Sequence, residues 1–274
     1  MDNRTEKCIV NKLRSAGCVF AEDEARILIS EALTLEVLMK MVEMRVDGLP
    51  LEYVVGWTEF CGLRIEVGRG VFVPRKRTEF LVHQAEALLR FRDIVVDLCC
   101  GSGVVGAALA AALVRVELYS ADIDPVAVKC ASRNVMDFGG QVFEGDLYKA
   151  LPHKLKGNVN ILVANVPYVP TELIKFLPQE ARLHEPKVTL DGGEDGLNIL
   201  RRVAEEALLW LAPDGHLLIE TSEIQASKAF EIFVGAGLTT KVARDEELDA
   251  TVIIGSNRVN KYTQLKGVKT KYFN

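Results

Sequence analysis

A glycine-rich loop with an acidic residue in front of it is the first feature of the sequence that can bind a cofactor. Residues 101–106 read GSGVVG and lie between a short apolar stretch and an alanine-rich one, which predicts a strand, a tight turn and a helix. This spacing occurs in dinucleotide sites, but Asp97 stands four residues before Gly101. A carboxylate there disfavours a pyrophosphate and favours a cationic ligand. We therefore expect S-adenosylmethionine (SAM), which carries a sulfonium and an ammonium group and no phosphate.

Acidic residues also follow the next two expected strands. Asp122 follows the strand expected at 116–121, and its carboxylate can accept hydrogen bonds from both ribose hydroxyls. Asp146 follows the strand expected at 141–144 and is placed near the adenine. Parallel strands end at one edge of an open sheet, where such folds bind their ligands. Asp124 is interpreted as a turn or capping residue.

The segment Asn165-Val166-Pro167-Tyr168 follows the strand expected at 159–164. The side-chain carbonyl of Asn165 and the main-chain carbonyl of the next residue can accept both hydrogens of a planar NH2 group. Pro167 stiffens the loop, and Tyr168 can stack on a flat amide or base. The pattern favours methylation of an amide or amino nitrogen without a metal. A plain Asn-x-Pro turn is the alternative, which the preceding SAM-type loop disfavours.

Composition restricts the classes of protein to which the chain can belong. Of its 274 residues 49% are hydrophobic and 26% charged, as in soluble globular proteins. No uncharged apolar stretch reaches membrane-spanning length and no signal peptide is evident, so we expect the cytoplasm. The net charge of −5 argues against a protein that wraps nucleic acid. The six cysteines form no C-x-x-C pair, so no metal site is expected.

Hydrophobic periodicity predicts a helical domain followed by an α/β domain. We expect an N-terminal helical substrate-recognition domain at 1–48, a linker with a β-hairpin at 49–78, a catalytic domain at 79–257 and a basic tail at 258–274. Strands alternate with helices from 94 onward, which indicates a doubly wound, mainly parallel sheet. The strands at 239–244 and 250–255 have no helix between them, so one is expected to run antiparallel at the edge. Thr78 is expected to cap a helix reaching about residue 89.

The chain resembles the HemK-type protein-(glutamine-N5) methyltransferases, which modify peptide chain release factors. The resemblance covers roughly 15–256 and is carried by Pro50–Gly56, Phe60-x-Gly62-Leu63, Val73-Pro74-Arg75-x-x-Thr78-Glu79, Asp97–Gly103, Asn165–Tyr168 and Glu185–Leu197. Two positions differ from the usual family pattern, because Val166 and Lys76 stand where the family has proline. The chain is therefore most similar to a divergent HemK-related branch.

The resemblance implies a Rossmann-like SAM-dependent methyltransferase fold, a glutamine N5-methyltransferase activity and a release factor as protein substrate. It implies that the glutamine is held by Asn165, Val166, Pro167 and Tyr168. Together with the acidic residues above, the expected SAM-binding residues are Asp97, Cys99, Cys100, Gly101, Ser102, Gly103, Asp122, Ile123, Asp146, Leu147 and Asn165. The family residue at the Leu147 position is often aromatic; a leucine can pack against the adenine but cannot stack on it.

Two other functions remain open at this point. The Asn-x-Pro-Tyr loop also suits adenine N6 or guanine N2 of a flipped-out base, but residues 1–48 hold seven basic and nine acidic residues, so no stable nucleic-acid binding is expected. A SAM-binding scaffold without activity is the other alternative. The basic residues Arg69, Arg75, Lys76 and Arg77 are interpreted either as a solvated loop or as a contact to an acidic partner or RNA. For Glu185, a structural role is favoured over that of a general base.

Overall fold

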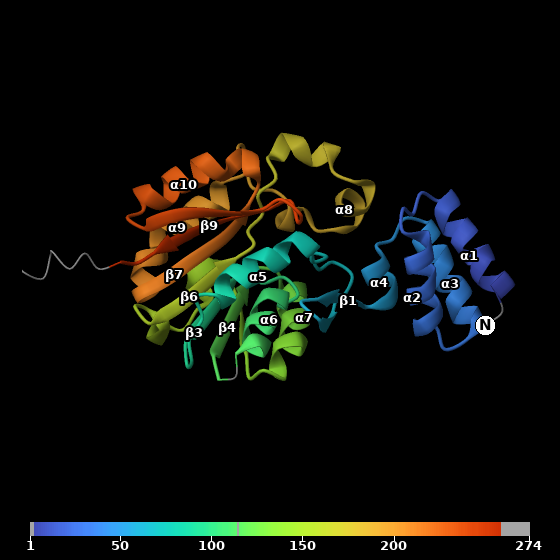
Figure 1. The fold of residues 1–274 in the computed structure, drawn as a ribbon, viewed down its shortest axis with the longest axis horizontal. Helices are drawn as coiled ribbons and strands as arrows, with labels where there is room; N and C mark the ends of the chain where they lie inside the picture. Colours follow the sequence, from blue (N-terminus) through green and yellow to red (C-terminus); the bar gives the residue numbers. More distant parts are fainter. Residues whose placement is uncertain (1–2, 114, 259–274) are drawn as a thin grey trace, which may run out of the picture.

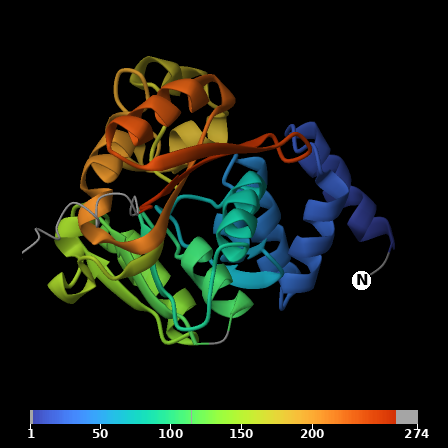
Figure 2. The ribbon, with the colours of Figure 1, turned by 60° about the vertical axis from the view of Figure 1, so that its left-hand side comes forward.

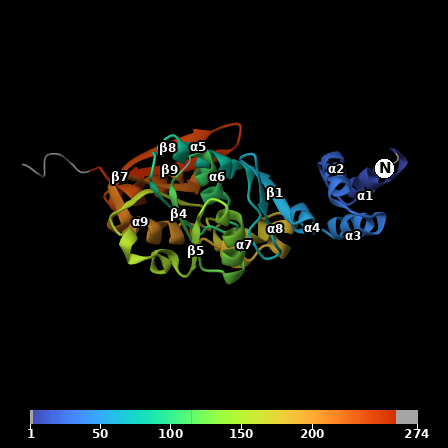
Figure 3. The ribbon, with the colours of Figure 1, turned by 90° about the horizontal axis from the view of Figure 1, so that it is seen from below.

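Three helices form the N-terminal part of the protein. The computed structural model describes residues 3–113 and 115–258. Helices α1 (Asn3–Ser15), α2 (Ala21–Glu31) and α3 (Leu35–Val46) pack around a fully buried cluster that includes Leu13 and Leu28, which confirms the expected helices. They lie outside the two helical layers that cover the sheet (Figures 1 and 3). The domain boundaries at 48, 78 and 257 stay predictions.

A short helix and a hairpin connect these helices to the rest of the chain. Helix α4 (Leu51–Val55) was not expected, because a five-residue helix is too short to show a periodic pattern. The expected hairpin is present as β1 (Trp57–Phe60) and β2 (Leu63–Glu66), paired antiparallel. Its two turn residues, Cys61 and Gly62, have φ of 47° and 72°, as a two-residue hairpin turn requires.

A seven-stranded sheet forms the centre of the larger part of the molecule, in the order β5-β4-β3-β6-β7-β9-β8. Its strands are β3 (Ile94–Leu98), β4 (Glu117–Asp122), β5 (Gln141–Glu144), β6 (Val159–Ala164), β7 (Leu211–Thr221), β8 (Thr239–Asp245) and β9 (Ala250–Ser256). Pairing from β5 to β7 is parallel, and β9 is antiparallel to both its neighbours. The antiparallel strand was expected at the edge, which is wrong. All residues of β9 are buried whereas β8 alternates, so β9 takes the inner place and β8 the edge.

Helices cover both faces of this sheet (Figure 2). Side chains alternate along a strand, so Val95 packs into the core beneath α5, α6 and α7, whereas Val96 packs into the core beneath α9 and α10. The helices are α5 (Glu79–Glu86), α6 (Val104–Ala112), α7 (Pro125–Met136), α9 (Asn198–Trp210) and α10 (Ala226–Gly235). This arrangement leaves the carboxyl ends of the parallel strands together at one edge. The expected α/β fold is confirmed.

Short helical turns add to the edge at which the strands end. Between β6 and α9 the chain forms α8 (Gln179–His184), flanked by the 3-10 turns η4 (Thr171–Phe176) and η5 (Lys187–Thr189), where only a loop was expected. Other 3-10 turns are η1 (Lys76–Thr78), η2 (Leu147–Ala150), η3 (His153–Leu155) and η6 (Glu223–Gln225). Apart from Arg258, the expected basic tail lies outside the described residues. Within the described part of the chain, no helix combines the length and apolarity needed to cross a bilayer.

Candidate active site

A cavity of about 680 Å³ opens at the carboxyl ends of β3, β4, β5 and β6. This volume is suitable for a cofactor and part of a substrate. Every residue expected to bind SAM or substrate contributes to its wall except Gly103. A Cβ at Gly103 would come within 3.1 Å of Ala131 and Val135, so this glycine allows close packing of α6 against α7 instead.

The glycine loop forms one wall of the cavity. Cys99, Gly101 and Gly103 have positive φ of 55°, 56° and 78°, which turns the chain sharply from β3 into α6. Cys99 is not a glycine, so its left-handed conformation is strained, as is frequent at binding sites. Burial raises the pKa of the Cys99 and Cys100 thiols. Both therefore stay protonated near neutral pH and are wall residues rather than nucleophiles.

Asp97 lies beneath this loop and is 1% exposed. Its Oδ2 accepts a hydrogen bond of 3.0 Å from the main-chain N–H of Gly106, so it shapes the start of α6. Burial raises the pKa of Asp97 to about 7, although the Gly106 hydrogen bond opposes the shift. A cation bound in the cavity would lower the pKa of this carboxyl and favour its ionised form.

Asp122 ends β4 and holds two loops together. Its Oδ2 accepts from Gly101 N at 2.8 Å and its Oδ1 from Asp124 N at 2.9 Å. Each oxygen keeps a further lone pair for a ribose hydroxyl. Burial raises the pKa of Asp122, and the hydrogen bonds from Asp124 and Gly101 oppose that rise. Asp124 caps α7 by accepting from Val126 N at 2.8 Å, as expected.

Asp146 is held by cations from the protein itself. Both its oxygens contact Arg202, at 2.6 and 2.7 Å, and Oδ2 also contacts Lys149 at 3.0 Å. Hydrogen bonding from Arg202 lowers the pKa of Asp146. Leu147 beside it is 9% exposed, with φ of 51°, and lines the cavity together with Ile199. These two apolar side chains provide the surface that a flat adenine needs.

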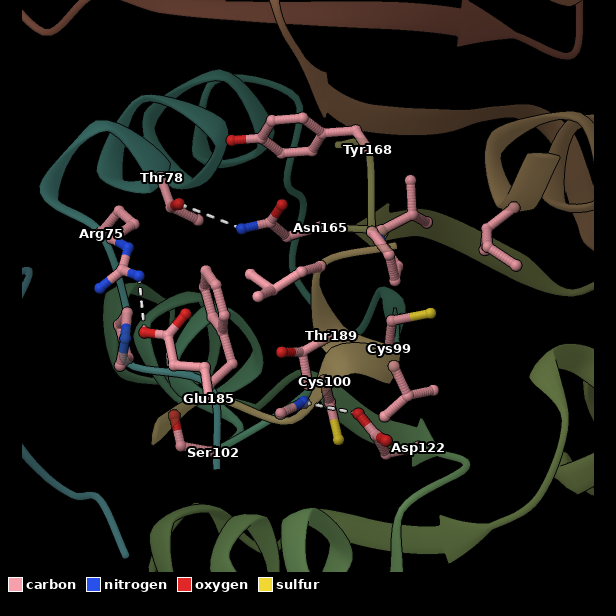
Figure 4. A pocket seen from close by; sticks show the side chains of 18 of the residues that line it. Arg75, Thr78, Cys99, Cys100, Ser102, Asp122, Asn165, Tyr168, Glu185 and Thr189 are labelled. Atoms are coloured by element: carbon pink, nitrogen blue, oxygen red, sulfur yellow. Dashed lines mark hydrogen bonds and ion pairs between the residues drawn. The ribbon is translucent and has the colours of Figure 1, made fainter. Parts of the chain in front are cut away.

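Asn165 follows β6, and the NH2 end of its side-chain amide is already hydrogen-bonded within the protein. Its Nδ2 donates a 3.2 Å hydrogen bond to Oγ1 of Thr78, and its oxygen points toward the side of Tyr168 (Figure 4). Among residues 3–113 and 115–258, none donates a hydrogen bond to the Asn165 side-chain oxygen or to the Val166 carbonyl. Two neighbouring acceptors therefore remain for a ligand, and the loss of proline at 166 does not remove the second.

Tyr168 is fixed through its hydroxyl, which donates to Oε1 of Glu220 at 3.2 Å and accepts from Arg77. Glu220 belongs to β7 and is 2% exposed. Burial raises the pKa of Tyr168, so its phenol is neutral. Sequence reasoning missed the role of Glu220, because nothing in the local sequence shows that β7 ends beside β6.

The Asn165–Tyr168 loop is supported from behind by the segment Gly192–Gly196. Gly192 N donates to Val169 O at 2.8 Å. Gln225 Nε2 donates to the carbonyl oxygens of Tyr168 and Asp195, at 3.0 and 2.9 Å. Because both segments are tied to each other and to η6, the loop has little freedom to move when substrate binds.

Both arginines of the basic run Arg75–Arg77 pair with carboxylates of the protein itself. Arg75 pairs with Glu185 at 2.6 Å and Arg77 with Glu220 at 3.3 Å, and of the three only Lys76 is exposed. The two arginine side chains remain 35% and 40% exposed, so the interpretation as a solvated loop stays open. Thr78 does not cap α5, because its hydroxyl bonds to Asn165 instead. Glu185, the partner of Arg75, is 6% exposed and lines the cavity wall.

Comparisons with known proteins agree with this geometry. A family model, the methyltransferase small domain, matches residues 64–177. The chain is 35% identical over 199 residues to a release factor glutamine methyltransferase of Geobacter sulfurreducens, covering 72% of this chain and 69% of that protein. It is 34% identical over 203 residues to a 4-amino-L-phenylalanine/4-methylamino-L-phenylalanine methyltransferase of Streptomyces pristinaespiralis, with the same two coverages.

A crystal structure of a methyltransferase from Pyrococcus furiosus shares the fold, with a TM-score of 0.55, 16% identity and coverage of 72% of this chain and 90% of that one. The glycine loop, the Asp122 carboxylate expected to bind ribose and the apolar surface of Leu147 and Ile199 fit SAM. The identity to the Geobacter protein extends over more than two thirds of both chains. The chain therefore belongs to the release factor glutamine methyltransferase family, and it is a SAM-dependent methyltransferase.

Proposed function

We propose that this enzyme methylates the side-chain amide nitrogen of a glutamine in a peptide chain release factor, in the cytoplasm. The observation that carries the proposal is the pair of acceptors formed by the Asn165 side-chain oxygen and the Val166 carbonyl at the end of β6. A primary amide has two N–H groups to satisfy such a pair. The function named for the Geobacter relative supports the same substrate.

The chemistry follows from holding a weak nucleophile in place. SAM supplies a methyl group on a sulfonium, which is electrophilic. The lone pair of an amide nitrogen is delocalised, so a fixed grip on both N–H groups is needed to aim that nitrogen at the methyl carbon. Such positioning can contribute roughly 7–11 kcal/mol in favourable cases. The methylated nitrogen loses its proton readily, so no strong base is required, and the Tyr168 phenol is not one.

The surroundings of the acceptor pair favour a protein over a nucleic acid. The positive charges of Arg75 and Arg77 are paired with Glu185 and Glu220, which weakens their attraction for phosphates. A second substrate class shares the chemistry, because the Streptomyces relative is named for 4-amino-L-phenylalanine. Its NH2 group also sits on an sp2 carbon and suits the same two acceptors.

The test is to incubate the purified enzyme with methyl-labelled SAM and release factors from cells that lack it. Separate reactions contain 4-amino-L-phenylalanine, total RNA and DNA. We expect a mass increase of one methylene group on a single glutamine of a release factor, and no such increase with the Asn165→Ala variant. Label on the free amino acid or on nucleic acid, with none on any release-factor glutamine, would refute the proposal.

A further inference from the structure

We infer that Thr78 is a positioning residue of this enzyme, whose hydroxyl fixes which end of the Asn165 amide meets the substrate. The inference rests on the proposed function only in that the substrate presents an NH2 group. It concerns the contact between η1 and the Asn165–Tyr168 loop. This contact joins two residues, Thr78 and Asn165, that are 87 positions apart in the sequence.

The orientation of Asn165 matters because its amide has an acceptor at one end and two donors at the other. The two ends are nearly equal in size, and the side chain rotates readily about its last bond. In the flipped orientation its NH2 would face the NH2 of the substrate, and no hydrogen bond would form. The enzyme therefore needs a neighbour that distinguishes the two ends.

Thr78 can make this distinction because a charged group fixes the direction of its own hydroxyl. A hydroxyl has one hydrogen to donate, and an ionised carboxylate can only accept. Glu220 Oε2 is buried and has no hydrogen-bond partner among the described residues. Thr78 is also among the groups that oppose the burial-driven rise in the pKa of Glu220, so we assign this oxygen as the acceptor of the Thr78 hydroxyl. With its hydrogen given to Glu220, Thr78 offers only lone pairs to Asn165. The Nδ2 end then lies 3.2 Å from Thr78, and the oxygen is left for the substrate.

Glu220 is held in place for this role. It is 2% exposed, and its Oε1 lies 3.3 Å from Arg77 Nε and 3.2 Å from the Tyr168 hydroxyl. Arg77 and Thr78 are neighbours in η1, so one turn brings both residues to the carboxylate. Thr78 is 1% exposed and stands at the N-cap of α5 without capping it. The protein therefore forgoes a capping bond worth about 1 kcal/mol and uses the hydroxyl elsewhere.

Thr78→Val removes the hydroxyl and keeps nearly the same volume, which makes it the direct test. We expect kcat with the release factor to fall by about tenfold, the order of one lost hydrogen bond, while the Kd for SAM changes by less than about twofold. Thr78→Ser should restore most of kcat. Thr240→Val on the edge strand β8 is the matched control, since the Thr240 hydroxyl donates to Leu238 O and contacts no part of the site. A kcat within twofold of wild type for Thr78→Val would overturn the inference.

A double-mutant cycle separates action through Asn165 from general damage. In the Asn165→Ala background, Thr78→Val should reduce the residual rate no further, because there is no amide left to orient. An equally large loss in both backgrounds would show that Thr78 acts by another route. Thermal unfolding of each variant identifies any that fail to fold, and Thr78→Ser then takes the place of Thr78→Val in the cycle.

A measurement without substrate keeps this test independent of the proposed function. The side-chain 15N–1H pair of Asn165 can be assigned in NMR spectra of the whole enzyme by its loss in Asn165→Ala. We expect Thr78→Val to shift this pair and to accelerate its exchange with water. An unchanged Asn165 signal in Thr78→Val would overturn the inference. If wild type fails to methylate release factors, the proposed function is refuted, whereas this signal still decides the role of Thr78.

Discussion

At the scale of single residues, the site contains several carboxyl groups whose ionisation is coupled to the binding of a positively charged cofactor. Asp97 and Asp122 line the part of the cavity formed by the glycine loop, and Glu220 lies behind the substrate loop. Asp97 and Glu220 are buried and Asp122 is half-buried, and each accepts hydrogen bonds from the protein. Burial raises the pKa of all three carboxyls. A positive ligand in the cavity lowers these pKa values again, so cofactor binding and protonation are coupled.

Asn165→Ala should reduce kcat by about 100-fold or more, because the substrate nitrogen loses one of its two fixed contacts. The Kd for SAM should change by less than about threefold, since Asp122 and Leu147, to which we assign the ribose and adenine contacts, belong to other parts of the cavity wall. Single-turnover rates and calorimetric titration with SAM measure the two quantities. An equal loss in both would mean that Asn165 serves the cofactor rather than the substrate.

The affinity for SAM should rise with pH up to about pH 7 and then level off. The folded, free enzyme holds a proton on Asp97 below its pKa of about 7, and a cation binds better when that carboxyl is ionised. Below this pKa, the Kd should increase by up to about tenfold per pH unit. Calorimetry in buffers of different ionisation enthalpy should show proton release near neutral pH. The Asp97→Asn variant is the control, and a similar pH dependence in it would contradict the assignment to Asp97.

The same shift predicts how stability depends on pH. The folded chain holds the Asp97 proton more tightly than the unfolded chain, whose reference pKa is 3.8. The stabilisation from protonated Asp97 is therefore present below about pH 4 and is lost as the pH rises to about 7. Denaturant unfolding without SAM should show that Asp97→Asn raises stability more at pH 8 than at pH 5. An equal effect of Asp97→Asn at both pH values would contradict a raised pKa of Asp97 in the folded protein.

At the scale of elements, the substrate loop depends on the glycine segment behind it. Gly192 and Gly196 pack directly against the main chain of Pro167 and Tyr168. Gln225, in η6, donates a hydrogen bond to the Tyr168 carbonyl oxygen. A side chain at either glycine would overlap a carbonyl oxygen of the loop. The geometry of the acceptor pair is therefore set by two loops together rather than by the Asn-x-Pro-Tyr segment alone.

Gly196→Ala should lower both activity and stability, because its Cβ would overlap the Tyr168 carbonyl and the Gln225 side chain, at a φ of +75°. Gly157→Ala is a matched control, since its φ is +73° and no atom lies within 4 Å of the position that its Cβ would occupy. The Gly196 change should cost roughly 1–3 kcal/mol more than the Gly157 change, as measured by urea unfolding. Equal costs would show that the two loops separate easily.

At the scale of the whole molecule, a buried arginine joins the helical part to the site. Arg45 on α3 contacts Glu24 on α2 at 2.6 Å and Glu180 on α8 at 2.5 Å. Arg45 and Glu24 are 8% and 9% exposed, whereas Glu180 lines the cavity. The N-terminal helices are therefore connected to the wall of the cavity through the ion pairs of Arg45 with Glu24 and Glu180, and not only through the linker.

Arg45→Met should destabilise the protein by roughly 3–5 kcal/mol, because Glu24 is left buried without its partner. Adding Glu24→Gln should recover part of the loss. With protein substrate KM should rise as α8 loses its contact, while the Kd for SAM stays constant. Lys40→Met on the same helix removes an exposed pair with Glu36 and should change stability by less than about 1 kcal/mol. An effect of Arg45→Met as small as that control would contradict this role of the Arg45 ion pairs.

The sequence by itself determined the local features of this protein. Strands, most helices, the glycine turn, the capping role of Asp124 and the Asn165–Tyr168 segment all follow from periodicity and turn chemistry, which act over a few residues. The chemistry of the acceptor pair was predictable for the same reason, since both acceptors belong to adjacent residues. Helices α4 and α8 were missed because five or six residues carry too little periodic pattern.

Only the tertiary structure decided which distant residues complete the site. Thr78, Glu220, Arg202 and Gln225 come from separate elements and meet the predicted residues only because the sheet order places β7 beside β6 and η1 against both. The inner position of β9 was likewise decided by competition for burial between two strands. Such outcomes depend on the packing of the whole chain, because a side chain's partners across the fold leave no trace in its neighbouring sequence.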